Sequence, residues 1–220
     1  IDALLEIARR YPNCIVVADE IYDGLDFTGE HVSVASRSED VPVVALNGVS
    51  KVYYAPGWRI GYMALHDPTN RMGLVRDGLE RLLRSRLCAS TPAQVGYLAG
   101  LEQDRGWMET YSERVLRRRD HCLKRIAQID GLEVEQPGGA FYMFVRLTDE
   151  RWANDDKAFV LQLLHEEHVL LVHGSGFSPQ LGKGHVRLVY LVTLEVLDEV
   201  FDRIERCLLY TSPSPRDSGQ

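Results

Sequence analysis

The sequence predicts a layered α/β domain followed by a smaller α+β domain, and three features of the 220-residue chain lead to this fold class. Short apolar runs, which are typical of strands covered on both faces, alternate with helical segments in the first half. A long, arginine-rich helical segment then covers residues 107–129. Beyond Gly131, strand and helix patterns follow one another in the manner of an α+β domain.

The first half supplies the elements of the α/β layers. Apolar residues at helical spacing predict a helix over residues 1–10, which Tyr11-Pro12-Asn13 ends. Two further helices are predicted over residues 70–86 and 91–103, the second with Pro92 in its first turn. Three runs are apolar at nearly every position and are predicted to be buried strands: residues 14–18, 42–46 and 60–65.

The second half predicts a smaller domain that is entered by the long helix. Beyond that helix the sequence changes pattern and contains short strand-like segments and two amphipathic stretches. The strands are expected at residues 132–136, 140–147, 169–172 and 185–191, and the helices at residues 155–167 and 194–206.

Charge and composition argue against several functional classes. The formal net charge is −7, from 25 Lys and Arg against 32 Asp and Glu, so neither a nucleic acid nor an anionic membrane is expected as a partner. The arginines between Arg114 and Arg125 are interleaved with acidic and apolar residues, which favours a solvated helix face over a nucleic-acid surface. No apolar run approaches the ~20 residues that span a bilayer. The first residues show neither an initiator Met nor a signal-peptide pattern, so we expect the chain to begin inside a longer gene.

Neither a metal site nor a disulfide framework is predicted. The four cysteines, at positions 14, 88, 122 and 207, contain no C-x-x-C pair, which favours a reducing compartment and a cytoplasmic protein. His165 and His168 lie three residues apart, whereas a zinc-protease helix places two histidines four apart so that both face one metal ion. We therefore interpret this pair as part of a solvated helix end.

The last fourteen residues, 207–220, are excluded from the predicted fold. Residues 207–217 can be written codon for codon as a transposase adapter from sequencing libraries, and eleven consecutive matches far exceed chance. The alternative is a frayed helix end, since Leu208 continues the preceding apolar stripe, followed by a polar Ser/Pro tail. We expect a non-native, disordered tail.

Chemically useful residues follow the predicted strands at the ends where ligands of open α/β sheets gather. Asp19 and Tyr22 follow the first strand, Ser50 and Lys51 follow the second, and Arg59 precedes the third. The separations are 32 residues from Asp19 to Lys51 and eight from Lys51 to Arg59. A lone lysine after a strand is usually a surface residue, but its position between a strand-end aspartate and an arginine favours a site.

Together these motifs resemble the active site of class I/II aminotransferases, enzymes of fold type I that use pyridoxal 5′-phosphate. The resemblance lies in three stretches that have the order and spacing of that family: residues 18–22, 50–51 and 56–62. It runs from residue 1 to about residue 206. It implies that residues 1–106 are the C-terminal part of a three-layer α/β cofactor-binding domain, and that residues 107–206 are the small domain.

The resemblance implies a role for each candidate residue. Lys51 matches the lysine that forms a Schiff base with the cofactor aldehyde and then moves the proton between the substrate Cα and the cofactor C4′. Asp19 matches the carboxylate that keeps the pyridine nitrogen protonated, and Tyr22 matches the phenol that hydrogen-bonds the cofactor's 3′-oxygen. Ser50 and Arg59 match phosphate ligands.

One further position extends the resemblance to the family, and another departs from it. Arg187, in the predicted strand 185–191, matches the arginine that binds the substrate α-carboxylate through two parallel hydrogen bonds. An arginine exposed on a sheet edge is the alternative. Gly48 departs from the family, many members of which carry a hydroxyl residue there. One hydrogen bond to the phosphate is therefore expected to be missing or to come from a backbone N–H.

Within the family, residues 46–54 and 86–94 look most like alanine aminotransferases of archaea and bacteria. This likeness implies transamination between alanine and 2-oxoglutarate by a homodimer of the complete protein. The alternatives are an aspartate or aromatic aminotransferase, the effector domain of a cofactor-binding transcription regulator, and a relic that binds no cofactor. The family builds its site from both halves of a subunit and from a partner subunit. We therefore expect the 220 residues alone to be inactive and poorly soluble.

Overall fold

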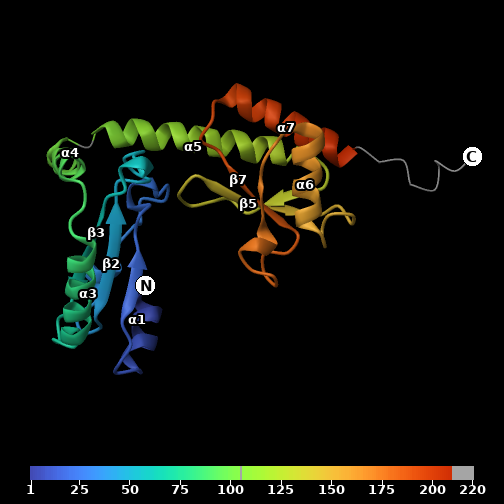
Figure 1. The fold of residues 1–220 in the computed structure, drawn as a ribbon. Helices are drawn as coiled ribbons and strands as arrows, with labels where there is room; N and C mark the ends of the chain where they lie inside the picture. Colours follow the sequence, from blue (N-terminus) through green and yellow to red (C-terminus); the bar gives the residue numbers. More distant parts are fainter. Residues whose placement is uncertain (105, 210–220) are drawn as a thin grey trace, which may run out of the picture. The chain divides into compact units, whose positions relative to one another are not determined.

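The computed structural model describes residues 1–104 and 106–209, which divide into two compact units (Figure 1). The first unit comprises Ile1–Glu109, and the second begins at Thr110. Within the described ranges, no helix is both long and apolar enough to cross a membrane. The assignment of residues 1–106 and 107–206 to a cofactor-binding domain and a small domain stays a prediction.

The first unit is built on a three-stranded sheet. Its strands are β1 (Val16–Asp19), β2 (Val43–Gly48) and β3 (Gly61–His66), in that order across the sheet. β1 and β2 run parallel, with Asp19 beside Leu46, whereas β3 runs antiparallel to β2, with Gly61 beside Gly48. The carboxyl ends of β1 and β2 therefore lie at the same edge of the sheet as the amino end of β3.

Helices cover parts of this sheet. They are α1 (Asp2–Arg9), α2 (Val34–Arg37), α3 (Gly73–Arg86) and α4 (Thr91–Glu102), together with the 3-10 turns η1 (Asp23–Leu25) and η2 (Pro56–Trp58). Leu5 and Ala8 of α1 pack against Val41, which lies just before β2. The predicted helices agree with α1, α3 and α4, whereas the single turn of α2 was not predicted.

The prediction of strands covered on both faces is right for β2. It is wrong for β1, where Val17 is 63% exposed, and for β3. Val43, Val44 and Ala45 of β2 are at most 7% exposed. In β3, however, Tyr62 is 48% exposed and Met63 44%. β3 pairs with β2 alone among the described strands, and a cavity of about 660 Å³ separates it from α3. Its apolar side chains therefore have few packing partners.

The second unit contains a four-stranded antiparallel sheet and most of a long helix, α5 (Gly106–Ile126). Along β5, Met143, Val145 and Leu147 are buried and alternate with the exposed Phe144 and Arg146, so one face of the sheet carries the core. Phe159 of α6 and Phe201 of α7 are fully buried in this core. The strands are β4 (Leu132–Val134), β5 (Tyr142–Leu147), β7 (His185–Val189) and β6 (Val172–His173), in that order, and the helices are α6 (Asp156–Glu167) and α7 (Leu194–Leu209).

The expectation that residues 207–220 are disordered is wrong for the first three of them. α7 continues to Leu209, with Cys207 1% exposed and Leu208 5% exposed. Both side chains continue the apolar stripe of Leu197, Phe201 and Ile204, so they complete the buried face of the helix. Arg151 also donates a hydrogen bond to the Leu208 carbonyl. Residues 210–220 lie outside the described part of the chain.

The pair His165 and His168 lies at the end of α6. His168 follows the helix in a left-handed conformation, with φ 57°, which ends the helical hydrogen bonding. Glu167, between the two histidines, forms an ion pair with Arg206 at 2.8 Å. This stretch therefore occupies a helix end, as interpreted from the sequence.

Candidate active site

The candidate residues of the first unit gather at one edge of its sheet. Asp19 is the last residue of β1, and the Glu20 N–H donates to the Leu46 carbonyl at 2.9 Å, so the chain stays beside β2 as it leaves the strand. The Val49 N–H donates to the Ile60 carbonyl at 3.3 Å. This bond joins the segment after β2, which carries the candidate lysine, to the segment before β3, which carries the candidate arginine.

A cavity of about 300 Å³ is lined by both candidate phosphate ligands, Ser50 and Arg59. Its walls also contain Asn47, Gly48 and Arg86. A serine hydroxyl and two guanidinium groups form a donor set that suits a phosphate dianion. Sequence reasoning missed Arg86, because it lies 27 residues after Arg59 and only the fold brings the end of α3 beside Gly61.

Arg59 is held by the turn that precedes it. It follows η2 in a left-handed backbone conformation, with φ 54° and ψ 42°, which is uncommon for a residue other than glycine. Its Nη1 donates to the Pro56 carbonyl at 2.7 Å. The turn thus fixes both the backbone and the guanidinium of this residue at the cavity wall.

The departure at Gly48 has a steric cause. A Cβ at this position would lie 2.8 Å from Gly61 Cα and 2.8 Å from the Ile60 carbonyl oxygen, both of which are backbone atoms. The close approach of β3 therefore excludes the hydroxyl residue that many family members carry. The Gly48 N–H does not replace that hydroxyl, because it donates to Asn47 Oδ1 at 2.7 Å.

Lys51 lies close to Tyr22, although 29 residues separate them in sequence. The Lys51 Nζ is 5.7 Å from the centroid of the Tyr22 ring. Both residues are half-buried, and Tyr22 lies at the start of η1, directly after the end of β1. The structure therefore brings together the lysine and the phenol that the family resemblance assigns to one cofactor.

The loop that carries Lys51 is anchored on α4 by aromatic residues that sequence reasoning missed. A Cβ at Gly96 would lie 2.6 Å from the Trp58 ring, and one at Gly100 would lie 3.0 Å from the Tyr53 ring. These two glycines, one helical turn apart, let both rings approach the helix backbone. The Tyr53 hydroxyl also donates to the Gly100 carbonyl at 3.4 Å.

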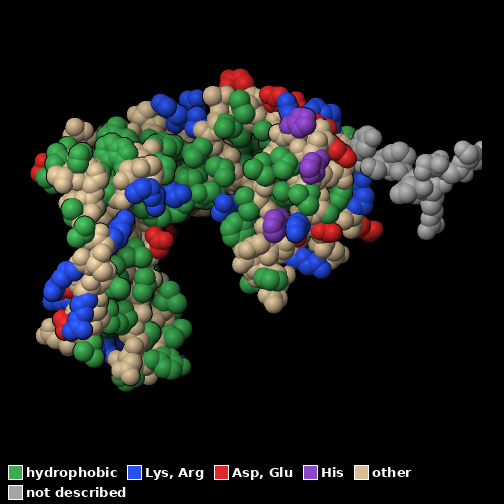
Figure 2. Space-filling view, in the orientation of Figure 1, with side chains coloured by type: hydrophobic (Ala, Val, Ile, Leu, Met, Phe, Trp, Pro, Cys, Tyr) green, Lys and Arg blue, Asp and Glu red, His purple; other side chains and the backbone are tan. Residues whose placement is uncertain are grey.

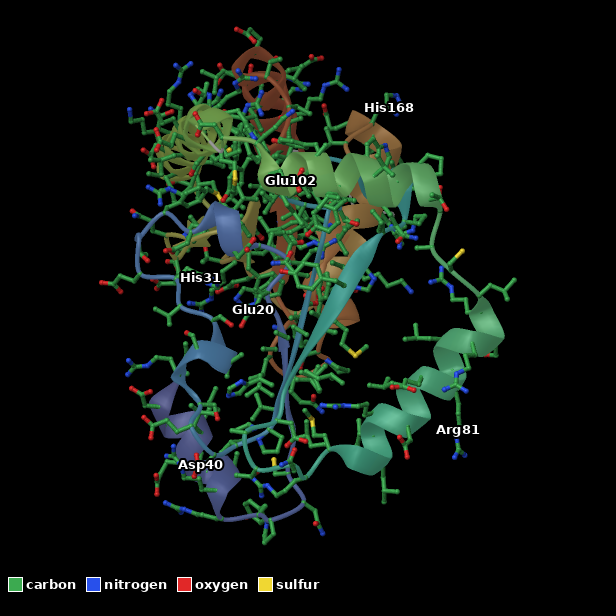
Figure 3. The ribbon with its side chains drawn as sticks, turned by 90° about the vertical axis from the view of Figure 1, so that its left-hand side faces the viewer. Glu20, His31, Asp40, Arg81, Glu102 and His168 are labelled. Atoms are coloured by element: carbon green, nitrogen blue, oxygen red, sulfur yellow. The ribbon has the colours of Figure 1, made fainter. Side chains whose placement is uncertain are left out.

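Glu20 has a structural role within the stretch that resembles the family motif. Its Oε1 accepts hydrogen bonds from Ser33 Oγ at 3.0 Å and from the Val34 N–H at 2.9 Å. These bonds tie the end of β1 to the start of α2, and Figure 3 labels Glu20 at this position. The acidic residue beside Asp19 therefore supports the loop that leads to Tyr22.

Arg187 lies in β7, which is flanked by β5 and β6, so it is not on an edge strand. Its guanidinium carbon is 4.8 Å from the Tyr142 ring centroid and 4.7 Å from that of Phe177. Its Nε is buried and has no hydrogen-bond partner among the described residues. A buried donor left without a partner costs about 1–3 kcal/mol. The unpaired Nε can therefore donate a hydrogen bond to an anionic acceptor, and a carboxylate suits the planar guanidinium.

The chain matches the family model described as "Aminotransferase class I and II" over residues 1–204, and it therefore belongs to this family. The glutamate-pyruvate aminotransferase AlaA of Haemophilus influenzae is 36% identical over 213 residues, which cover 93% of this chain and 51% of the relative. The aspartate aminotransferase of Thermotoga maritima is 33% identical over 207 residues, with coverages of 93% and 50%.

A solved structure of an alanine aminotransferase from Pyrococcus furiosus has a TM-score of 0.90 to this chain at 45% identity. The match covers 94% of this chain and 52% of that structure. This chain therefore spans about half the length of the relatives that it matches. The predicted fold class, part of a pyridoxal-phosphate-dependent transferase fold, is confirmed.

Proposed function

We propose that the complete protein transfers an amino group between an L-amino acid and a 2-oxo acid with pyridoxal 5′-phosphate as cofactor. Family membership supports the reaction class. The observation that carries the proposal is the position of Lys51, which directly follows the cavity residue Ser50 and lies 5.7 Å from the Tyr22 ring. A primary amine, a phenol and a cavity whose lining suits an anion thus occur at one edge of the sheet.

The residues of this edge fit the parts of the cofactor. When bound, pyridoxal 5′-phosphate supplies an electron sink for the charge that develops at the substrate Cα. Ser50 and Arg59 would hold the phosphate, and Tyr22 would hydrogen-bond the ring oxygen. Asp19 would hold the proton on the ring nitrogen, and Lys51 would act as the catalytic acid and base that moves the proton at the substrate Cα.

Arg187 is proposed to bind the substrate α-carboxylate. Its unpaired, buried Nε and its planar guanidinium suit two parallel hydrogen bonds to a carboxylate. The Tyr142 and Phe177 rings restrict the guanidinium, so little rotamer freedom is lost on binding. A carboxylate fixed in this way fixes the direction of the Cα–H bond as well.

We infer that alanine is the amino donor and 2-oxoglutarate the acceptor. The likeness to relatives named for alanine and for glutamate and pyruvate supports this choice. An aspartate aminotransferase is the second candidate. The family likeness also supports a cytoplasmic homodimer, with no nucleic acid or membrane among the proposed partners.

The test uses a chimaera, because the chain spans about half of its relatives. Residues 1–209, which include the whole of α7, replace the matching half of the archaeal alanine aminotransferase. In this protein, Lys51→Ala should abolish the cofactor adduct that borohydride traps and should slow transamination by about a thousandfold or more. Lys124→Ala, an exposed lysine of α5, is the control that should change neither.

Two results would contradict the proposed function. One is near-normal turnover in Lys51→Ala. The other is a chimaera that binds the cofactor but uses none of alanine, aspartate or phenylalanine as donor. Comparing kcat/KM for these three donors separates the alanine proposal from the aspartate and aromatic alternatives.

A further inference from the structure

A buried carboxylate in the second unit joins three segments of the chain. Asp156, the first residue of α6, is 2% exposed. Its Oδ2 accepts the Ser175 N–H at 2.8 Å, and its Oδ1 accepts the Gly184 N–H at 3.3 Å. His173 Nδ1 is 3.8 Å from Oδ2 and 3.0 Å from Ser175 Oγ. One side chain therefore ties α6 to both ends of the segment that precedes β7.

The Asp156 carboxylate is kept in its charged form. Burial acts to raise its pKa. The hydrogen bonds from Ser175 and from the Gly184 N–H together lower the pKa by more than burial raises it, so the pKa lies below the usual value. A buried carboxylate with these donors has a fixed orientation, because each lost hydrogen bond exposes a charge to a poorly hydrated environment.

The segment held by Asp156 has little freedom to adjust. A Cβ at Gly174 would collide with the Gly182 carbonyl oxygen, and a Cβ at Gly182 would collide with Gly174 O. Gly184 has φ +73°, a conformation that favours glycine, and approaches the Ala153 carbonyl. The 3-10 turn η3 (Gly174–Gly176) and the start of β7 are therefore packed as one tight loop.

The two segments that this loop joins both lead to Arg187. Phe177 directly follows η3, and its ring centroid is 4.7 Å from the Arg187 guanidinium carbon. Gly184 lies immediately before β7, three residues from Arg187. Asp156 accepts hydrogen bonds from two N–H groups. These groups thus belong to the segments that place the Phe177 ring and the Arg187 backbone.

We propose that Asp156 is a positioning residue for substrate binding: it fixes η3 and the start of β7 so that Phe177 and β7 hold the Arg187 guanidinium ready for a carboxylate. This inference rests on the proposed function, because it assigns the α-carboxylate to Arg187. Asp156 itself does not touch the substrate. Its effect passes through the position of another side chain, which separates it from a residue that only stabilises the fold.

The experiment measures carboxylate binding apart from turnover. In the chimaera, calorimetry gives the dissociation constant of propionate, an acid that cannot react, with propionamide as the probe without a carboxylate. Asp156→Ala and the milder Asp156→Asn should weaken propionate binding, roughly tenfold for Ala, and should raise the KM for alanine with little change in kcat. Phe177→Leu, at a 53% exposed position, should act in the same direction without disturbing the core.

Asp155→Ala is the matched control. Asp155 precedes Asp156 and accepts the Ala158 N–H at 3.0 Å, so its loss weakens the same helix end without touching the loop. It should lower the melting temperature but leave the propionate affinity unchanged. Equal effects of Asp155→Ala and Asp156→Ala on affinity would overturn the inference, because both would then act through stability.

Arg187→Ala distinguishes failure of this inference from failure of the proposed function. If Arg187→Ala leaves propionate affinity unchanged, the carboxylate assignment is wrong and both proposals fall. If it weakens binding while Asp156→Ala and Phe177→Leu do not, only the positioning role is overturned. In the double variant Asp156→Ala/Arg187→Ala, binding should be no weaker than in Arg187→Ala alone, and additive losses would contradict the inference.

Discussion

Single backbone positions determine which side chains the anion cavity contains. At Gly48 a hydroxyl side chain would meet backbone atoms of Ile60 and Gly61 at 2.8 Å. Gly48→Ser, which restores the residue type common in the family, should therefore lower the free energy of unfolding by about 1–3 kcal/mol, measured by urea denaturation. Gly57→Ser is the control, because a Cβ there meets nothing within 4 Å. A stable Gly48→Ser protein with tighter cofactor binding would contradict the steric explanation.

Arg86 allows a second test at a single residue. Its guanidinium lines the cavity, and the sequence did not predict it as a site residue. Arg86→Ala should weaken binding of pyridoxal 5′-phosphate about tenfold, the value of one charge-assisted hydrogen bond. Binding of pyridoxal, which lacks the phosphate, should not change. Arg84→Ala is the control, since Arg84 lies on the same helix and pairs with Glu80 at 3.2 Å. Equal losses for both ligands would show that Arg86 acts on the fold and not on the phosphate.

At the scale of elements, the last turn of α7 belongs to the core of the second unit. A chain that ends at Arg206 loses the buried side chains of Cys207 and Leu208. Burial raises the pKa of the Cys207 thiol to about 11, so this side chain is neutral and apolar at pH 7. The truncation should lower the free energy of unfolding by about 2–4 kcal/mol relative to a chain that ends at Leu209. Equal melting temperatures of the two chains would show that this turn is dispensable.

The contact between α5 and α7 makes stability depend on pH. Asp198 of α7 is 2.6 Å from Arg125 and 2.9 Å from His121, and the hydrogen bond from Arg125 is the main cause of its lowered pKa. A carboxyl group with a pKa lower in the folded state stabilises the protein above the unfolded pKa, and this stability is lost as the pH falls through the folded pKa. Asp198→Asn should therefore be less stable than the parent at pH 7, and the difference should shrink below about pH 4. A difference that is constant from pH 7 to pH 3 would contradict this account.

Local sequence patterns predicted the elements that have regular spacing or unbroken apolar runs. The helix over residues 91–103 and the strand over residues 42–46 are examples, close to α4 and β2. The predicted strand 169–172 failed because Val169 and Leu171 are buried by packing, while only Val172 and His173 join the sheet ladder. An apolar run indicates burial, and it does not by itself specify strand pairing.

The candidate site was predictable where its residues adjoin strand ends, as Asp19, Lys51 and Arg59 do. Their roles came from the resemblance to a family and not from the pattern itself. Arg86 and Asp156 were missed, because Arg86 lies 27 residues from Arg59 and Asp156 lies 19 residues from Ser175, and no short motif records such distant pairs. The glycines at positions 96 and 100 were a usable signal, since two glycines one helical turn apart indicate a close approach by another group.

At the scale of the whole chain, the first unit exposes a large apolar surface. Exposed fractions reach 63% for Val17 of β1, 67% for Leu82 and 60% for Leu83 of α3, and 48% for Tyr62 of β3. Figure 2 shows hydrophobic side chains on the surface of this unit. β1 and β3 are both edge strands of the described sheet. Exposed apolar side chains beside unpaired strand edges favour association with another chain.

The chain expressed by itself should therefore self-associate. Light scattering of the purified chain should show a mass that rises with concentration, whereas the chimaera, in which the other half of the relative is present, should reach a fixed mass. Met63→Lys and Leu82→Lys place charges on β3 and α3 and should lower the association. Leu170→Lys is the control, because Leu170 is 71% exposed but belongs to the second unit. A chain that stays monomeric at high concentration, or a Leu170→Lys variant that acts like the other two, would show that the exposed face of β3 and α3 does not drive association.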